Sequence, residues 1–258
     1  MALDSRWVRQ EVSTFLHIEM PGGFDAECYD EIRQLGQLYP GNSTGPAFLR
    51  AMNAMAYRYR AMHEAQREFA GSLVVGGLMP APEERFIQEK ALVHFFFDGV
   101  SCVEALAFSA YAIGAHLIPA KFPFDEKTQS RIDLAFTSKA FASAWSEEPL
   151  TKELAGIENS SEWKNLKQFR NLLSHRGHPT RTFEFPDGAE GSIETSIQAD
   201  FLPIRQPNSK PPGSPFPMSL DLEFFSSRRR WLDQKVSQTL RELHQFMTGT
   251  AEAARKNL

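Results

Sequence analysis

Arg170, Asn171 and His175 are the residues of this chain whose types and spacing best suit the handling of a phosphate, and His178 lies three positions further along. An arginine guanidinium is a planar fork that matches phosphate oxygens, and an adjacent carboxamide can orient the same group. A histidine can accept or donate a proton near neutral pH. This set can therefore hold a phosphate and move a proton.

The segment that carries these residues has the periodicity of an amphipathic helix. At about 100° per residue, one half of the circumference is apolar and carries Trp163, Leu166, Phe169, Leu172 and Leu173. The opposite half is polar and carries Lys164, Gln168, Asn171 and His175. Arg170 falls on the apolar side, about 140° from His175, so its guanidinium should be partly buried and need an acceptor. Glu104, in a predicted central helix, is the candidate acceptor.

Residue types that start and stop helices mark the two ends of this segment. Ser160 or Ser161 can cap the first turn. Gly177 suits a left-handed cap, and Pro179 cannot continue a helix. His175 is therefore expected in the final turn, where the helix dipole favours a protonated histidine.

Helices are also predicted over much of the remaining chain, whereas the first 45 residues are predicted to be irregular. Prolines and glycines interrupt the short apolar pieces of that extension at 21–23, 40–42 and 45–46. Apolar spacing of three or four predicts helices over about 46–71, 82–118, 126–145 and 149–157, with a bend expected at Gly99. A last helix is expected to begin near Ser226 or Ser227.

The stretch before the last helix has a different composition. Residues 182–185 and 193–197 alternate as strands do, and Pro186, Asp187 and Gly188 favour a turn between them. Prolines then crowd residues 203–217, which excludes a helix or a central strand. The predicted fold is therefore all-α: one helical domain over 46–258, with a small β-hairpin and proline-rich insertion at about 181–225.

Composition limits the function classes. The formal net charge of −4 and the isoelectric point near 6.0 argue against a protein coated in positive charge, so any nucleic-acid site must be local. Two cysteines, Cys28 and Cys102, give no disulfide framework and fit a reducing cytoplasm. The first residues lack the basic and then apolar layout of a secretory signal.

One apolar segment, residues 99–118, has almost the length of a membrane span. Glu104 lies inside it, and a carboxylate at mid-membrane costs about 2.5 to 3.5 kcal/mol on insertion scales. A buried central helix is therefore favoured over a membrane helix.

A long core helix followed by a later helix that ends Arg170-Asn171-x-x-x-His175-Arg176-Gly177 resembles the HEPN superfamily, whose members carry arginine, often a polar residue next, and histidine after a gap of four to six. The resemblance covers residues 83–178 and extends to the C-terminal helix. It implies a helical bundle that dimerises, brings two motif helices together and cleaves RNA without a metal or another cofactor. By position in the motif, the resemblance gives Arg170, Asn171 and His175 the catalytic roles.

The same resemblance implies partners and a cellular role. RNA is the expected substrate, and a local basic surface for it is available from Lys164, Lys167, Arg176 and Arg181. A second proton-transfer group would come from the other subunit of a homodimer or from His178. The resemblance also implies a cytoplasmic toxin or antiviral defence component, with an antitoxin or another protein as partner.

Two other readings stay open. A catalytically inactive HEPN-like module could bind nucleotide, RNA or a protein partner through the same residues. Alternatively, the protein could be structural, and Arg170, Asn171 and His175 would then serve only to stabilise the end of a helix. Arg58 and His63 repeat the arginine-to-histidine spacing without the adjacent asparagine, and Arg228-Arg229-Arg230 is typical of a solvated patch that could instead join the basic surface.

Overall fold

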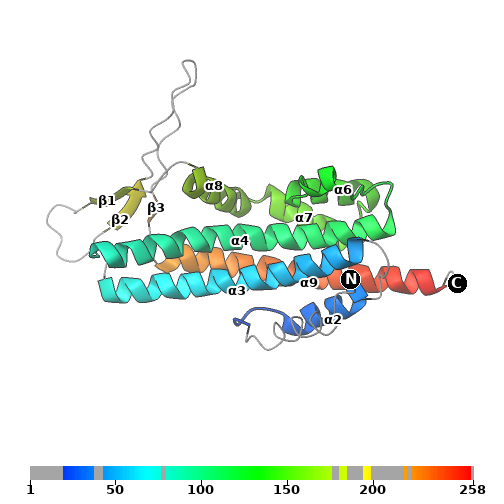
Figure 1. The fold of residues 1–258 in the computed structure, drawn as a ribbon, viewed down its shortest axis with the longest axis horizontal. Coiled ribbons are helices and arrows are strands. Elements are labelled where there is room, and N and C mark those ends of the chain that lie inside the picture. The colour runs from blue at the N-terminus through cyan, green and yellow to red at the C-terminus, as the bar shows by residue number, and fades with distance from the viewer. Residues whose placement is uncertain are drawn as a thin grey trace, which may run out of the picture. The chain divides into compact units, whose positions relative to one another are not determined.

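The computed structural model describes residues 20–37, 43–76, 80–175, 180–184, 194–198, 218–219 and 222–256 (Figure 1). This part of the chain is all-α apart from three short strands, so the predicted fold class is confirmed at that level. In chain order the elements are α2 (Ala26–Gln37), α3 (Thr44–Gly76), α4 (Pro82–Leu117), α5 (Glu126–Gln129), α6 (Leu134–Ala144), α7 (Pro149–Asn159), α8 (Ser161–His175), β1 (Thr180–Glu184), β2 (Glu194–Gln198), β3 (Met218–Ser219) and α9 (Leu222–Lys256).

The chain divides into two compact units. The first comprises Met1–Arg60, Ser101–Glu158 and Asp233–Leu258, and the second comprises Ala61–Val100 and Asn159–Leu232. The three longest helices, α3, α4 and α9, each contribute residues to both units. The second unit contains α8 and therefore the candidate phosphate-handling residues.

In the first unit, α2 corrects the prediction of irregular structure for the described part of residues 1–45, while residues 1–19 and 38–42 lie outside the described residues. Its buried positions are spaced as on one face of a helix: Cys28, Tyr29, Ile32, Arg33 and Gly36. The Tyr29 hydroxyl donates to Asn53 Oδ1 of α3 at 3.1 Å, and Ser237 Oγ of α9 donates to the Gly23 carbonyl at 2.7 Å. Pro21, Gly22 and Gly23 precede this helix and do not prevent it.

The predicted helix over residues 126–145 is also wrong, because two helices replace it. Asp125 caps α5 by accepting from the Thr128 backbone N–H at 2.9 Å. Asp133 caps α6 in the same way, accepting from the Phe136 backbone N–H at 2.8 Å. Aspartate starts helices well because its side chain satisfies a donor that has no partner in the first turn. Asp133 therefore starts a new helix within the predicted one.

In the second unit, α3 and α4 run in opposite directions. Gln88 Nε2 donates to the Ser72 carbonyl at 3.2 Å, while Lys90 Nζ lies 2.8 Å from Glu68 Oε1, earlier in α3. The α4 helix continues through Gly99 without interruption, and the bend expected there stays a prediction. A Cβ atom at Gly99 would lie 3.0 Å from Leu232 Cδ1, which shows that the glycine allows close packing.

The strands of the second unit form a three-stranded sheet in the order β1-β2-β3. Strands β1 and β2 are antiparallel with Thr180 opposite Gln198, and β3 pairs antiparallel with β2. The α9 helix then begins at Leu222, four or five residues before the predicted start. Packing of Phe224 and Phe225 into aromatic contacts explains the earlier start, because these rings gain burial when that turn is helical.

The α4 helix is long and apolar enough to cross a membrane. However, 61% of its most apolar window is buried inside the protein. A helix of a soluble core meets the same criteria of length and composition, and the burial favours that interpretation.

Two helical glycines give a matched test of packing in the first unit. A Cβ at Gly114 would lie 2.6 Å from Cε1 of the fully buried Phe122, whereas nothing lies within 4 Å of a Cβ at Gly156. We expect Gly114→Ala to lower the free energy of unfolding by about 1 to 3 kcal/mol, because overpacking outweighs the better helix propensity of alanine. Gly156→Ala should instead raise it by about 0.5 to 1 kcal/mol. Urea unfolding measures both changes, and equal effects would contradict the packing around Gly114.

The thiol of Cys28 tests the docking of α2. Burial, followed by the carboxylates of Asp25 and Glu31, raises the pKa of Cys28 from 9.0 to about 11. In a Cys102→Ala background, native Cys28 should react with iodoacetamide at pH 8 about 100-fold more slowly than the unfolded chain, since the thiolate is the nucleophile. The raised pKa contributes stability that is complete below pH 9 and is lost as the pH rises toward about 11. Alkylation at the rate of the unfolded chain would contradict the burial of α2.

Candidate phosphate site on α8

Two fully buried side chains hold the first half of α8 in the second unit. Trp163 and Leu166 are 0% exposed. Ser160 Oγ accepts from the Trp163 backbone N–H at 3.1 Å, which confirms a serine cap and selects Ser160 over Ser161. The helix therefore starts at a defined residue with one face fixed in the core.

Phe169 holds the second half of α8. Its ring centroid lies 5.0 Å from that of Phe96 on α4 and 5.7 Å from that of Phe224 on α9. Phe96 is fully buried, while Phe169 and Phe224 are half-buried. Aromatic pairs at these distances favour particular ring geometries. Phe169 therefore sets the rotation of α8 at the residue immediately before the candidate site.

Arg170 and Asn171 have the exposures that the helical periodicity predicts. Arg170 is half-buried on the apolar side, and Asn171 is exposed together with Lys164 and Gln168. Ser174 Oγ donates to the Arg170 carbonyl at 2.6 Å, within the last turn. The arginine and the asparagine therefore present their side chains in different directions at one end of α8.

His175 is the last residue of α8. Its side chain lies outside the described part of the structure. Other predictions that fall outside it concern residues 176–179, which include Arg176, Gly177, His178 and Pro179, and the side chain of Arg181 in β1. The predicted turn at 186–188 and the proline-rich stretch at 203–217 also lie outside the described residues. The catalytic and RNA-binding roles of these residues stay predictions.

The two predicted RNA-binding lysines of α8 are described. Lys164 is exposed, and its Nζ donates to the Asn159 carbonyl at 3.0 Å. Lys167 is half-buried, with its Nζ 5.6 Å from the Trp163 ring centroid. Both stems follow the helix surface, and their ammonium groups add positive charge along α8.

Acidic residues near the middle of α4 fall into different units. Glu104, the predicted acceptor for Arg170, belongs to the first unit, whereas α8 belongs to the second. Their pairing therefore stays a prediction. Asp98 is a carboxylate of the second unit that is only 3% exposed, and its Oδ2 lies 3.7 Å from His94 Nδ1. Asp98 directly precedes the apolar segment 99–118 in the sequence.

Arg228, which the sequence indicated only as part of a basic run that could join the RNA-binding surface, adds a cation beside α8. Its guanidinium carbon lies 3.4 Å from the Phe224 ring centroid and 5.7 Å from that of Phe169. Its Nη1 donates to the Phe224 carbonyl at 3.0 Å. The contact between Phe224 and Arg228 could be predicted from the sequence, because residues four positions apart are neighbours on a helix.

The comparison pair Arg58 and His63 has a different environment. Arg58 is exposed, with its guanidinium 5.6 Å from the ring centroid of the exposed Tyr57. His63 is 5% exposed. The same sequence spacing thus places one side chain in solvent and the other in the core.

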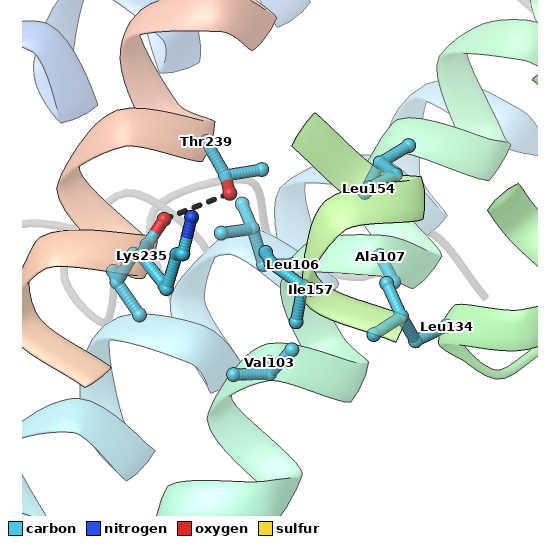
Figure 2. A pocket seen from close by; sticks show the side chains of 9 residues that line it. Val103, Leu106, Ala107, Leu134, Leu154, Ile157, Lys235 and Thr239 are labelled. Carbon is cyan, nitrogen blue, oxygen red and sulfur yellow. Dashed lines mark hydrogen bonds between the residues drawn. The ribbon is translucent and has the colours of Figure 1, made fainter. Parts of the chain in front are cut away.

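A pocket of the first unit is closed by packing (Figure 2). It lies between α4, α6, α7 and α9 and leaves no room for a water molecule. Thr239 Oγ1 donates to the Lys235 carbonyl at 2.8 Å, as drawn in Figure 2, and Lys235 Nζ pairs with Glu153 Oε1 at 3.1 Å. This space is a narrow gap between packed helices and does not suit a ligand. Its lining residues are Val103, Leu106, Ala107, Leu134, Leu154, Ile157, Lys235, Val236 and Thr239.

Among the described residues, no group of three or more histidine, cysteine, aspartate or glutamate side chains could hold a metal ion. The two cysteines are free and buried.

Comparisons of this chain with protein-family models, curated proteins and solved structures gave no match. The resemblance to the HEPN superfamily therefore rests on the residues of α8 and on the order of the helices, and it stays a hypothesis.

Neighbouring residues of α8 allow its packing and its polar surface to be tested separately. Phe169→Ala should lower the free energy of unfolding by about 2 kcal/mol, because the half-buried ring loses its contacts with Phe96 and Phe224. Asn171→Ala should change it by less than about 0.5 kcal/mol, because the side chain is exposed. Chemical denaturation of both variants provides the measurement. A large loss in the asparagine variant would mean that Asn171 has a structural role.

Proposed function

We propose that this chain is a metal-independent endoribonuclease of the HEPN type. The observation that supports this most is the arrangement at the end of α8. Arg170 is half-buried, Asn171 is exposed, His175 ends the helix, and the Arg228 guanidinium lies beside Phe169. Groups suited to holding a phosphate and moving a proton thus gather in one short segment that buried aromatic residues hold in place.

In the proposed reaction, the ribose 2′ oxygen forms a bond to phosphorus and the bond from phosphorus to the 5′ oxygen breaks. Arg170 contacts the non-bridging oxygens, where negative charge grows, and Asn171 orients the phosphate. His175 either takes the proton of the 2′ hydroxyl or gives a proton to the leaving 5′ oxygen. The products are a 2′,3′-cyclic phosphate and a 5′ hydroxyl.

The reaction needs a second proton-transfer group besides His175. In the proposal it comes from the second subunit of a homodimer or from His178. RNA is the substrate, and Lys164 and Lys167 add to the local positive charge. A cytoplasmic role as a toxin or defence component, with an antitoxin or another protein partner, follows from the HEPN resemblance and belongs to the same proposal.

Cleavage of RNA by the purified protein in EDTA tests the proposal. We expect wild-type protein to give products that end in a 2′,3′-cyclic phosphate. His175→Ala should reduce the rate about 10²- to 10⁴-fold, because one proton transfer loses its catalyst. Arg170→Ala should reduce it about 10²- to 10³-fold, because the charge that develops on the phosphate is less well stabilised. Mass spectrometry of the products and single-turnover rates provide the measurements.

Arg58→Ala is the matched control, since it removes an arginine with the same spacing to a histidine, and its rate should equal that of wild type. Thermal melting of all variants separates loss of activity from loss of fold. If wild type cleaves a broad set of RNAs no faster than the variants do, the inactive binding module replaces the enzyme as the preferred function. If His175→Ala melts well below wild type, a structural role for the polar cluster is preferred instead.

A further inference from the structure

Phe169, Phe224 and Arg228 form a cluster at the junction of α8 and α9, here called the aromatic-arginine platform. The two rings lie 5.7 Å apart at an interplanar angle of 79°, and the guanidinium carbon lies 3.4 Å from the centre of the Phe224 ring. All three residues are half-buried, whereas the neighbouring Phe96 and Phe225 are fully buried. The platform is therefore the solvent-accessible end of a buried aromatic cluster.

The guanidinium of Arg228 is held in place. Nη1 donates to the Phe224 carbonyl at 3.0 Å, and the cation lies over the Phe224 ring. A side chain that is already ordered loses less conformational entropy when a ligand binds. Arg228 thus differs from Arg230 of the same run, which is exposed and pairs with Glu223.

The platform lies beside the proposed reaction site, because Phe169 directly precedes Arg170 on α8. The Arg228 guanidinium carbon is 5.7 Å from the Phe169 ring centroid. If the phosphate of one RNA nucleotide contacted Arg170, the next nucleotide of the RNA would therefore lie close to these two rings and to the Arg228 guanidinium.

The chemistry of the platform fits an unpaired nucleobase. Bases that are not stacked in a duplex bind proteins by stacking on aromatic rings and on arginine guanidinium planes. In a duplex, these base faces are already covered by neighbouring bases. The Arg228 guanidinium, which lies over the Phe224 ring, therefore favours single-stranded RNA over double-stranded RNA.

We propose that the aromatic-arginine platform formed by Phe169, Phe224 and Arg228 binds one unpaired nucleobase of the RNA next to the phosphate held at Arg170. This inference rests on the proposed endoribonuclease function and adds to it a preference for single-stranded substrate. It assigns Arg228 to substrate binding and gives it no part in proton transfer.

Binding of RNA by a His175→Ala parent, which prevents cleavage during the measurement, tests the platform. The probes are a fluorescent single-stranded RNA of about ten nucleotides and the same strand in a duplex, followed by anisotropy. Arg228→Ala should weaken binding of the single strand about fivefold or more. Arg228→Lys should weaken it nearly as much, because lysine keeps the charge but lacks the plane that stacks. Binding of the duplex should change less than twofold in both variants.

Arg85→Ala is the matched control. Arg85 is an exposed arginine of the second unit that pairs with Glu89 at 2.7 Å, so its removal should change the affinity less than twofold. Phe224→Leu keeps an apolar side chain while removing the ring, and it should reproduce the effect of Arg228→Lys. Thermal melting of each variant identifies any loss of affinity that comes from unfolding.

The outcomes separate the platform from the proposed function. If Arg228→Lys binds the single strand as the parent does, or if single strand and duplex lose affinity equally, Arg228 acts only as a charge and the platform is refuted. If Arg228→Ala and Phe224→Leu only lower the melting temperature, the cluster is a structural clamp and the platform is again refuted, while cleavage by wild type still supports the endoribonuclease. If the predicted binding losses occur but wild type does not cleave, the platform stands and the endoribonuclease proposal fails. A parent that binds no RNA refutes both.

Discussion

The packing of Phe169 against Phe96 and Phe224 is the interaction on which the candidate site depends. A helix as short as α8 has little stability of its own in water and gains most of it from packing one apolar face. Trp163 and Leu166 bury the first half of that face, and Phe169 fixes the second half. Because Phe169 directly precedes Arg170, its contacts set the direction in which Arg170 and Asn171 project. The orientation of the candidate site at the end of α8 therefore depends on packing in the aromatic core.

This dependence matters for the proposed function, in which a mildly acidic protein binds RNA. The formal charge of −4 gives no general attraction for nucleic acid, so binding has to come from a few cations held in place. Lys164, Lys167 and Arg170 lie on α8, and Arg228 is ordered over the Phe224 ring. Cations that are already positioned lose less entropy on binding than flexible ones do. In the proposed function, the aromatic core thus positions the cations that bind RNA and also stabilises α8.

The sequence predicted α8 well because its signals are local. The spacing of its apolar residues fixes which face is buried, and Ser160 marks the start. The α2 helix was missed because prolines and glycines lie on either side of its short apolar stripe in the sequence. The break between α5 and α6 was missed because the spacing of apolar residues does not mark the cap that Asp133 provides. The contact of Arg228 with Phe169 could not be predicted, because it joins residues separated by the strands and the proline-rich stretch and depends on how the chain folds back. Local sequence patterns thus predicted α8, whereas the residues that pack against α8 could be identified only from the tertiary structure.

The most direct test of metal-free transesterification is the cleavage, in EDTA, of an RNA oligonucleotide and of the same oligonucleotide with a single 2′-deoxyribose at the cleaved position. The proposed mechanism needs the 2′ oxygen as the nucleophile, so the substituted position should no longer be cleaved while other positions are cleaved as before. Continued cleavage at the 2′-deoxy position would contradict the mechanism. Activity in the unmodified RNA that is lost in EDTA and restored by a divalent metal would contradict it as well.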